Sequence, residues 1–135
     1  YRVIEKVYIA PKDLRAHWDY LRPKLELVLQ KRPEQWIPED VYADILNGHS
    51  LLWIAFKVDK PIAFIVGQIQ ANQTFHLWAG YCDAHIDDYF KWHMIEEIAQ
   101  EAKCKRISFE SWRKGWARKA KRLGFVPRKY IKELL

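Results

Sequence analysis

The chain has little cysteine and no long hydrophobic run. Only Cys82 and Cys104 occur among its 135 residues. Two thiols are more typical of small buried side chains in a reducing compartment than of a disulfide framework, although a Cys82–Cys104 disulfide stays open. No apolar run approaches the roughly 18 residues of a membrane span, and no secretory hydrophobic region is present. We therefore expect an intracellular, cytoplasmic protein without a membrane span.

Repeats, low-complexity tracts and linkers are also absent, so we expect one domain over residues 1–135. A chain of this length commonly forms a single hydrophobic core. Half of the residues are hydrophobic and 15% are aromatic, with seven Trp, which is enough apolar material for such a core and argues against disorder.

Acidic side chains are scarce in the C-terminal quarter. Residues 103–135 hold 12 Lys and Arg against only Glu110 and Glu133, a net charge of +10. Residues 1–102 hold 11 basic and 15 acidic side chains, a net charge of −4. This asymmetry predicts an anionic partner for the C-terminal quarter: nucleic acid, a phosphate-bearing cofactor or an acidic protein surface.

Hydrophobic periodicity and turn residues predict an α+β protein in the order β-α-α-β-β-β-α-β-α-β. The first helix opens at Pro11, and Pro23 inside its apolar pattern predicts a kink or two abutting helices. The expected strands cover 1–9, 51–58, 62–70, 74–82 and 106–111, with a last one beginning at Phe125, and the expected helices cover 11–29, 38–46, 88–103 and 114–123. The sequence thus indicates about six strands and about four helices.

This order, together with the segment ARKAKRLGF at 117–125, resembles the GNAT superfamily of acyl-CoA-dependent N-acyltransferases. The resemblance spans the whole chain and implies a mixed, mostly antiparallel sheet. It also implies that the strands at 74–82 and 106–111 splay apart to admit the pantetheine arm of CoA. The helix at 88–103 would then point its N-terminus at the pyrophosphate.

The segment CDAHIDDYFKW at 82–92 departs from this family. GNAT proteins bind the diphosphate with a loop of the form R/Q-x-x-G-x-G/A, whose backbone N–H groups must approach the phosphates closely. Residues 82–92 contain neither glycine nor arginine. Asp87 and Asp88 would instead place carboxylates on the positive end of the helix dipole and disfavour a diphosphate by about 1 kcal/mol each.

The general acid of the family is the second departure. The resemblance places a proton-donating tyrosine at position 120, where this chain has Ala120, and an asparagine at position 113, where it has Arg113. Alanine cannot protonate a departing thiolate. We therefore expect a degenerate GNAT protein, a pseudoenzyme with no cofactor, although whether the chain is an enzyme stays open.

The segment SWRKGWARKAKRLGF at 111–125 also resembles small GNAT-like proteins encoded by phages and prophages. That resemblance implies a virion-associated or otherwise partner-binding protein. Its contacts would come from a basic C-terminal face made of Trp112, Arg113, Lys114, Trp116, Arg118, Lys121 and Arg122. The partner would be another protein or a second copy docking through the acidic segment 71–102, whereas nucleic acid is supported by charge alone.

The alternative hypothesis is an N-acyltransferase that holds acetyl-CoA with a non-standard loop. Arg113, Lys114 and Arg118 would then contact the phosphates, and Tyr81 or Tyr89 would be the acid. Gly80 would mark a bulge in the fourth strand. Bases in this family tend to come from the middle strands, where His76 is the better candidate by its ordinary pKa, although a buried, hydrogen-bonded structural role for His76 is favoured.

Cysteine, histidine and acidic residues crowd the stretch CDAHIDDYFKWHMIEE at 82–97, which raises the question of a metal site. His93 and Glu97 are one helical turn apart, and Cys82 and His85 form a lone C-x-x-H. Zinc sites need three or four ligands on one side, which this spacing does not supply. We expect no metal site and a solvated helix face instead.

Overall fold

The structure, a computed structural model, describes residues 4–31, 35–83, 88–109, 122 and 130–134. Six strands form one sheet in the order β1-β2-β3-β4-β5-β6, and neighbours are antiparallel except for the parallel pair β4 and β5. The strands are β1 (Ile4–Ile9), β2 (Leu51–Lys57), β3 (Lys60–Gln70), β4 (Thr74–Cys82), β5 (Arg106–Phe109) and β6 (Tyr130–Glu133). The helices are the 3-10 turn η1 (Pro11–Asp13), α1 (Leu14–Lys31), α2 (Pro38–Leu46) and α3 (Asp88–Glu101).

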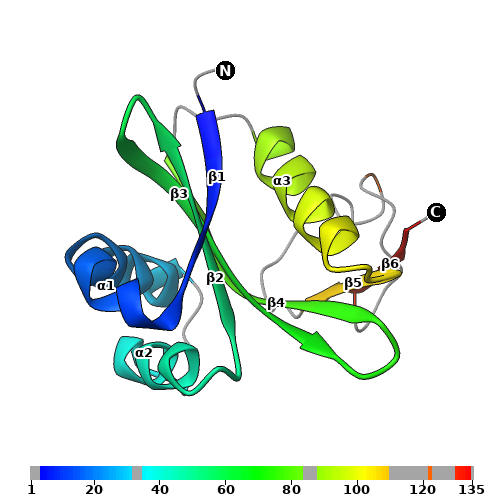
Figure 1. Cartoon of the computed structure of the whole chain (residues 1–135), viewed down its shortest axis with the longest axis horizontal. Coiled ribbons are helices and arrows are strands. Elements are labelled where there is room, and N and C mark those ends of the chain that lie inside the picture. The colour runs from blue at the N-terminus through cyan, green and yellow to red at the C-terminus, as the bar shows by residue number, and fades with distance from the viewer. Residues whose placement is uncertain (1–3, 32–34, 84–87, 110–121, 123–129, 135) are drawn as a thin grey trace.

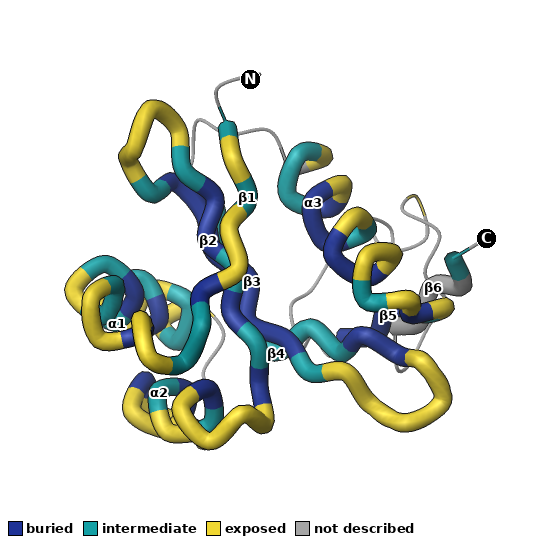
Figure 2. Tube along the Cα trace, in the orientation of Figure 1, coloured by how far each residue is buried: buried dark blue, intermediate teal, exposed yellow. Residues whose placement is uncertain are grey.

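The helices cover the two faces of the sheet separately. In Figure 1, α1 and α2 lie on one side of the strands and α3 lies on the other. Two apolar clusters match this arrangement, one between α1, α2 and the sheet and one between α3 and the sheet. Figure 2 shows buried residues along the middle of β2, β3 and β4, where both faces are covered. Such nearly continuous burial explains why these strands read as long apolar runs.

Local sequence accounts for the ends of α2. Pro38 occupies the first helical position, where its missing N–H leaves no hydrogen bond unmade. The Asp40 carboxylate accepts a hydrogen bond from the Ile37 N–H at 2.9 Å. Gly48, with φ of 82°, follows the last turn in the left-handed conformation that glycine favours. The bounds predicted for this helix are the observed ones.

The helix α1 corrects one expectation. It runs from Leu14 to Lys31 as a single helix with Pro23 inside it, so the prediction of two abutting helices is wrong. Proline removes one backbone hydrogen bond from a helix interior. The apolar stripe compensates because Leu14, Leu21 and Leu25 lie on both sides of Pro23 and are at most 1% exposed.

The class and the element order agree with the sequence prediction as far as the structure describes the chain. The sheet is mixed and mostly antiparallel, and the chain is α+β and GNAT-like. The predicted helix at 114–123 and the predicted strand residues 125–129 lie outside the described residues, apart from the helical residue Arg122. Within the described ranges, no helix combines the length and the apolar character needed to cross a membrane.

Candidate active site

Strands β4 and β5 pair only over a short distance. Thr74, Phe75 and His76 of β4 face Arg106, Ile107 and Ser108 of β5 in register. Beyond His76, β4 continues to Cys82 with no β5 partner among the described residues. The GNAT resemblance implies a parting of the fourth and fifth strands here, and residues 110 and 111 of the predicted fifth strand lie outside the described residues.

A β-bulge lies in β4 next to this parting. Val66 pairs with Ala79 and Gly67 pairs with Leu77, so Trp78 is the extra residue on β4. A bulge bends the strand and re-aims its side chains. Here the Trp78 ring packs edge-on against Trp36, at 5.7 Å between ring centroids, which ties the segment between α1 and α2 to β4.

The bulge is two residues from the predicted position. Gly80 pairs regularly with Ile65, so it does not mark the bulge. The glycine that matters sits opposite, on β3: a Cβ added to Gly67 would lie 2.3 Å from the Phe75 ring atom Cζ. The Phe75 ring therefore fills the space that a side chain at position 67 would take, beside the irregular step in the ladder.

Among the described residues, His76 is the last residue of β4 that pairs with β5. Its ring Nδ1 is 2.8 Å from the Ser108 hydroxyl Oγ across the β4–β5 pair. Ser108 is fully buried and His76 is half-buried. This hydrogen bond fixes the plane of the imidazole, so the expectation of a buried, hydrogen-bonded histidine and the hypothesis of a base are compatible.

A second polar group lies on the same side of the sheet as α2. Gln68, the register partner of His76, places its side-chain Nε2 3.2 Å from the Ser50 hydroxyl and 3.4 Å from the Asp44 carboxylate. The Ser50 hydroxyl donates a short hydrogen bond to the same carboxylate. Asp44 also lies 3.6 Å from the ring Nδ1 of His49. Polar side chains thus run from α2 across β3 to the base candidate.

Tyr81 lies near the end of β4, where it pairs with Phe64 of β3, and its side chain packs in the cluster under α1 and α2. Its ring is stacked with Phe64 at 6.1 Å, and Tyr20 of α1 meets Phe64 edge-on at 6.3 Å. Burial and a hydrogen bond to Asp83 raise the pKa of Tyr81 above its ordinary value. Burial, reinforced by the charge of Asp83, raises the pKa of Tyr20 as well. Both phenols therefore keep their protons at neutral pH.

The other predicted site residues are placed less closely. Tyr89 is 58% exposed in the first turn of α3, so it lies on the opposite face of the sheet from Tyr81. Arg122 is exposed. The remaining residues of the predicted basic face lie outside the described residues: Trp112, Arg113, Lys114, Trp116, Arg118 and Lys121.

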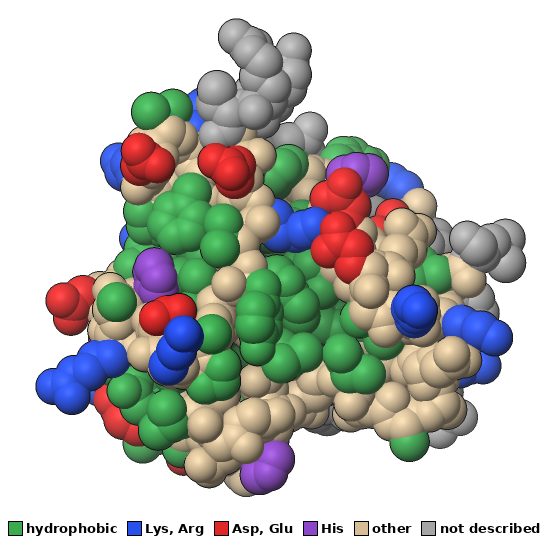
Figure 3. All heavy atoms as spheres, in the orientation of Figure 1, with side chains coloured by type: hydrophobic (Ala, Val, Ile, Leu, Met, Phe, Trp, Pro, Cys, Tyr) green, Lys and Arg blue, Asp and Glu red, His purple; other side chains and the backbone are tan. Residues whose placement is uncertain are grey.

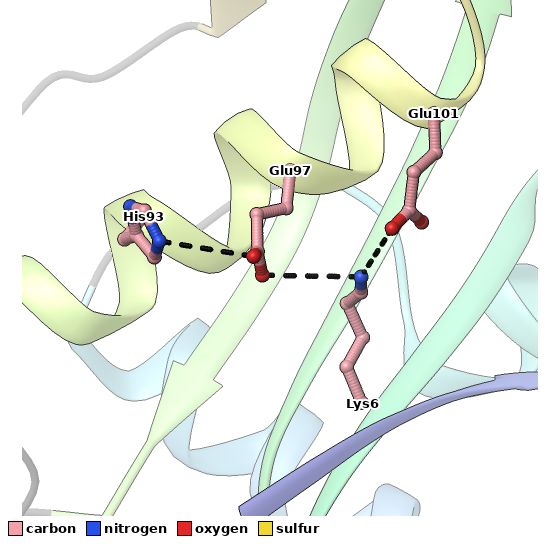
Figure 4. Close-up of polar contacts among 4 residues, drawn as sticks. All are labelled: Lys6, His93, Glu97 and Glu101. Carbon is pink, nitrogen blue, oxygen red and sulfur yellow. Dashed lines mark hydrogen bonds and ion pairs between the residues drawn. The ribbon is translucent and has the colours of Figure 1, made fainter.

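The crowded acidic stretch forms ion pairs with β1. Lys6 Nζ lies 2.9 Å from a Glu101 carboxylate oxygen and 3.9 Å from one of Glu97, and Glu97 is also 3.8 Å from the His93 ring Nε2 (Figure 4). Lys6 therefore bridges Glu97 and Glu101, so the carboxylate that could have shared a metal ion with His93 is paired with a lysine. Among the described residues, no three His, Cys, Asp or Glu side chains are grouped as metal ligands.

The two cysteines are free thiols, so the disulfide left open by the sequence is not formed. Burial raises the pKa of both the Cys82 and the Cys104 thiol above the ordinary value. A thiol is a nucleophile only after it loses its proton. The environment of both residues therefore disfavours a nucleophilic role.

The chain resembles solved acetyltransferase structures along its whole length. Its sequence matches no protein-family model and no curated protein. The PaiA N-acetyltransferase from Thermoplasma acidophilum, solved with coenzyme A, has a TM-score of 0.64 at 18% identity, covering 96% of this chain and 98% of that chain. A GNAT-family acetyltransferase from Staphylococcus aureus has a TM-score of 0.69 at 12% identity, with 98% and 99% covered.

The aminoglycoside 6'-acetyltransferase type Ii also has a TM-score of 0.69 at 12% identity, with 97% of both chains covered. The chain has the GNAT fold. At these identities the likeness concerns the fold alone.

Sequence reasoning missed Trp78 and Ser108. The signal for Ser108 was a single polar residue between the apolar Ile107 and Phe109 of a strand predicted to be buried, because a buried hydroxyl needs a partner. No comparable signal marks Trp78 as the bulge residue, because glycine, here Gly80, is the residue type that more commonly indicates a bulge.

Proposed function

We propose that the chain is an N-acyltransferase that moves an acyl group from acyl-CoA to an amine, with His76 as the general base. The observation that carries the proposal is the position of His76 at the last described pair between β4 and β5, with its ring held by Ser108 at 2.8 Å. The GNAT fold, shared with several acetyltransferases, supports the same reading.

The described part of the chain fits the pantetheine arm of CoA. From Leu77 to Cys82, the edge of β4 toward β5 lacks a strand partner among the described residues, and such an edge can hydrogen-bond the amides of an extended ligand. The proposed phosphate contacts, Arg113, Lys114 and Arg118, lie outside the described residues. They remain a prediction, as does any repulsion from Asp87.

The expectation that CoA binding has been lost rested on the missing loop and on Ala120. The structural neighbours favour the alternative, because one of them was solved with coenzyme A and the others are described as acetyltransferases. The virion-associated reading and its basic partner-binding face stay predictions from the sequence.

When bound, acyl-CoA supplies a thioester carbonyl that an amine can attack. An alkylamine is mostly protonated at neutral pH, so a base must first accept a proton from its ammonium group. Imidazole is suited to this because its ordinary pKa lies close to neutral. Ser108 orients the ring through Nδ1, so the proton is accepted at Nε2. Ser108 thereby acts as a positioning residue.

Neither of the two predicted proton donors lies beside the base candidate. The raised pKa of Tyr81 keeps it protonated, but it is five positions along β4 from His76, on the order of 15 Å, which is too far to protonate a thiolate released where His76 acts. Tyr89 lies across the sheet, on the helix α3, at the face opposite to that of Tyr81.

The test is acyl transfer from acetyl-CoA to a panel of amines, followed as release of free thiol. His76→Gln should lower kcat/KM about 100-fold or more, the usual size of a general-base contribution. His49→Gln is the matched control, because His49 is exposed at the end of α2 and should be replaceable. Absence of turnover on every amine, together with no CoA density in crystals soaked with it, would refute the proposal.

A further inference from the structure

The side chain of Lys24 lies over two tyrosine rings. Its ammonium Nζ is 5.2 Å from the centroid of the Tyr81 ring and 5.9 Å from that of the Tyr20 ring. Both distances are within the range in which an aromatic face attracts a cation. An alkylammonium group therefore already has a defined binding position between α1 and β4, and in this structure the side chain of Lys24 occupies it.

This binding position includes a carboxylate and a hydroxyl as well as the two ring faces. Asp83 hydrogen-bonds Tyr81, and its carboxylate lies close enough to Tyr20 to raise the pKa of that phenol. The Tyr20 hydroxyl is buried and has no hydrogen-bond partner among the described residues. A buried hydroxyl without a partner is unfavourable, and an ammonium group has three N–H donors to offer it. Lys24 contributes attraction from above the rings but leaves this hydroxyl unsatisfied.

The binding position over Tyr20 and Tyr81 lies on the same sheet face as the proposed base. Tyr81 and His76 both belong to β4, and both lie on the face of the sheet that carries α1 and α2. They are five positions apart along the strand, which is on the order of 15 Å. An ammonium over Tyr81 is therefore too far from His76 to be the reacting amine. It would be a second cationic group of the same molecule.

We propose that Tyr20, Tyr81 and Asp83 form a binding site for a second alkylammonium group of the acceptor, so that the preferred substrate is a long aliphatic diamine. Lys24 holds this site when no substrate is present and leaves it when the substrate's cation enters. The identification of that molecule as the acceptor rests on the proposed function, whereas the cation site itself does not.

The cation site is tested by binding alone. n-Butylammonium chloride is titrated into the 15N-labelled full chain, and the amide shifts near Tyr20 and Tyr81 are followed by NMR, with n-butanol as the neutral control. Lys24→Ala removes the competing ammonium and should tighten binding about 3-fold or more, in line with an ordinary cation–π contribution. Lys31→Ala, an exposed lysine of the same helix, should change nothing.

Two further variants separate the ring face from the charge. Tyr81→Phe keeps the aromatic face and should still bind n-butylammonium, whereas Asp83→Asn removes the carboxylate and should weaken binding. Equal shifts with n-butanol, or no gain in affinity for Lys24→Ala, would overturn the proposal. Both outcomes are read on folded protein, because the amide spectrum reports folding directly.

The substrate class is tested by turnover. With acetyl-CoA, 1,8-diaminooctane should have a KM several-fold below that of n-octylamine, and Asp83→Asn should remove this difference. If n-butylammonium binds as expected but no amine is acylated, the proposed function fails and the cation site stands. If amines are acylated with equal KM values and Lys24→Ala has no effect on binding, the cation site fails and the proposed function stands.

Discussion

Tyr81 belongs to the proposed cation site, and its raised pKa can be measured. Its pKa is raised by burial and by its hydrogen bond to Asp83, from an ordinary value of 10.0. Titration of the seven tyrosines by absorbance at 295 nm should therefore show late ionisation from Tyr20 and Tyr81, and Tyr81→Phe should remove the part that belongs to Tyr81. Because the folded state disfavours the phenolate, stability is full below pH 10 and falls as the pH rises beyond it. A single transition at the ordinary pKa, unchanged by Tyr81→Phe, would contradict this.

Gly67 and Gly80 form a matched pair of glycines in neighbouring strands. An added Cβ at position 67 would lie 2.3 Å from the Phe75 ring, whereas at position 80 the nearest atom, Ile65 Cδ1, is 3.4 Å away. Gly67→Ala should therefore lower the free energy of unfolding by about 1–3 kcal/mol, the usual cost of overpacking, and Gly80→Ala by clearly less. Urea unfolding of both variants tests this, and equal effects would show that the ladder is not arranged as described.

Val58 has a backbone conformation that is unfavourable for valine. It has φ of 49° in the turn between β2 and β3 and is 74% exposed. Positive φ is unfavourable for a β-branched side chain and much less so for asparagine. Val58→Asn should raise the free energy of unfolding by about 0.5–1 kcal/mol, whereas Val58→Ile should leave it nearly unchanged. Thermal unfolding measures both, and a less stable Val58→Asn variant would be the contrary result.

At this scale the sequence could point to His76, because histidine is the best base among the polar residues of the middle strands. It could not place Trp78. Whether an extra residue enters β4 at position 78 or 80 depends on how the Phe75 ring fits against Gly67, and that contact between neighbouring strands leaves no periodic mark on either segment.

The elements are joined by ion pairs that local sequence does not reveal. Arg22 of α1 lies 2.7 Å from Glu39 of α2 and 3.0 Å from Glu26 one turn further along its own helix. The hydrogen bond from Arg22 lowers the pKa of Glu39. The stability linked to this carboxylate is therefore present above its ordinary pKa and is lost as the pH falls through the lowered value.

Arg22→Gln should return the pKa of Glu39 towards its ordinary range. NMR titration of the glutamate carboxyl carbons measures the shift, and Arg15→Gln on the same helix is the control. A pKa of Glu39 that stayed low in Arg22→Gln would mean that another group causes the shift. The pair is exposed, so its effect on global stability should be small.

Element bounds were predictable where turn chemistry and apolar periodicity agree, as in α2 and in the strands β2 to β4. Of the two outcomes predicted for Pro23, two abutting helices are wrong, because the rule for proline is local whereas α1 is held together by an apolar stripe that contacts the sheet. Pairing between β4 and β5 is equally non-local. The parting of these strands stays a prediction from the GNAT resemblance.

The whole molecule presents two differently covered sheet faces. Figure 3 shows hydrophobic side chains gathered in the middle of one face of the molecule, between α1 and α2 on one side and α3 on the other, with acidic and basic groups around them. The charge asymmetry of the sequence adds to this picture, since the C-terminal quarter carries the excess of basic side chains. Exposed hydrophobic patches and surfaces with an excess of one charge are both typical of contacts with other macromolecules.

The central claim is that the GNAT sheet still binds acyl-CoA in the parting between β4 and β5. Calorimetric titration of the full chain with acetyl-CoA tests it most directly, because it requires no knowledge of the acceptor. If the chain binds acyl-CoA, one equivalent should bind saturably with a Kd of about 1–100 μM, in the range common for enzyme substrates. No saturable heat up to about 1 mM acetyl-CoA would contradict it and would return the chain to the class of proteins that keep the GNAT fold without its cofactor.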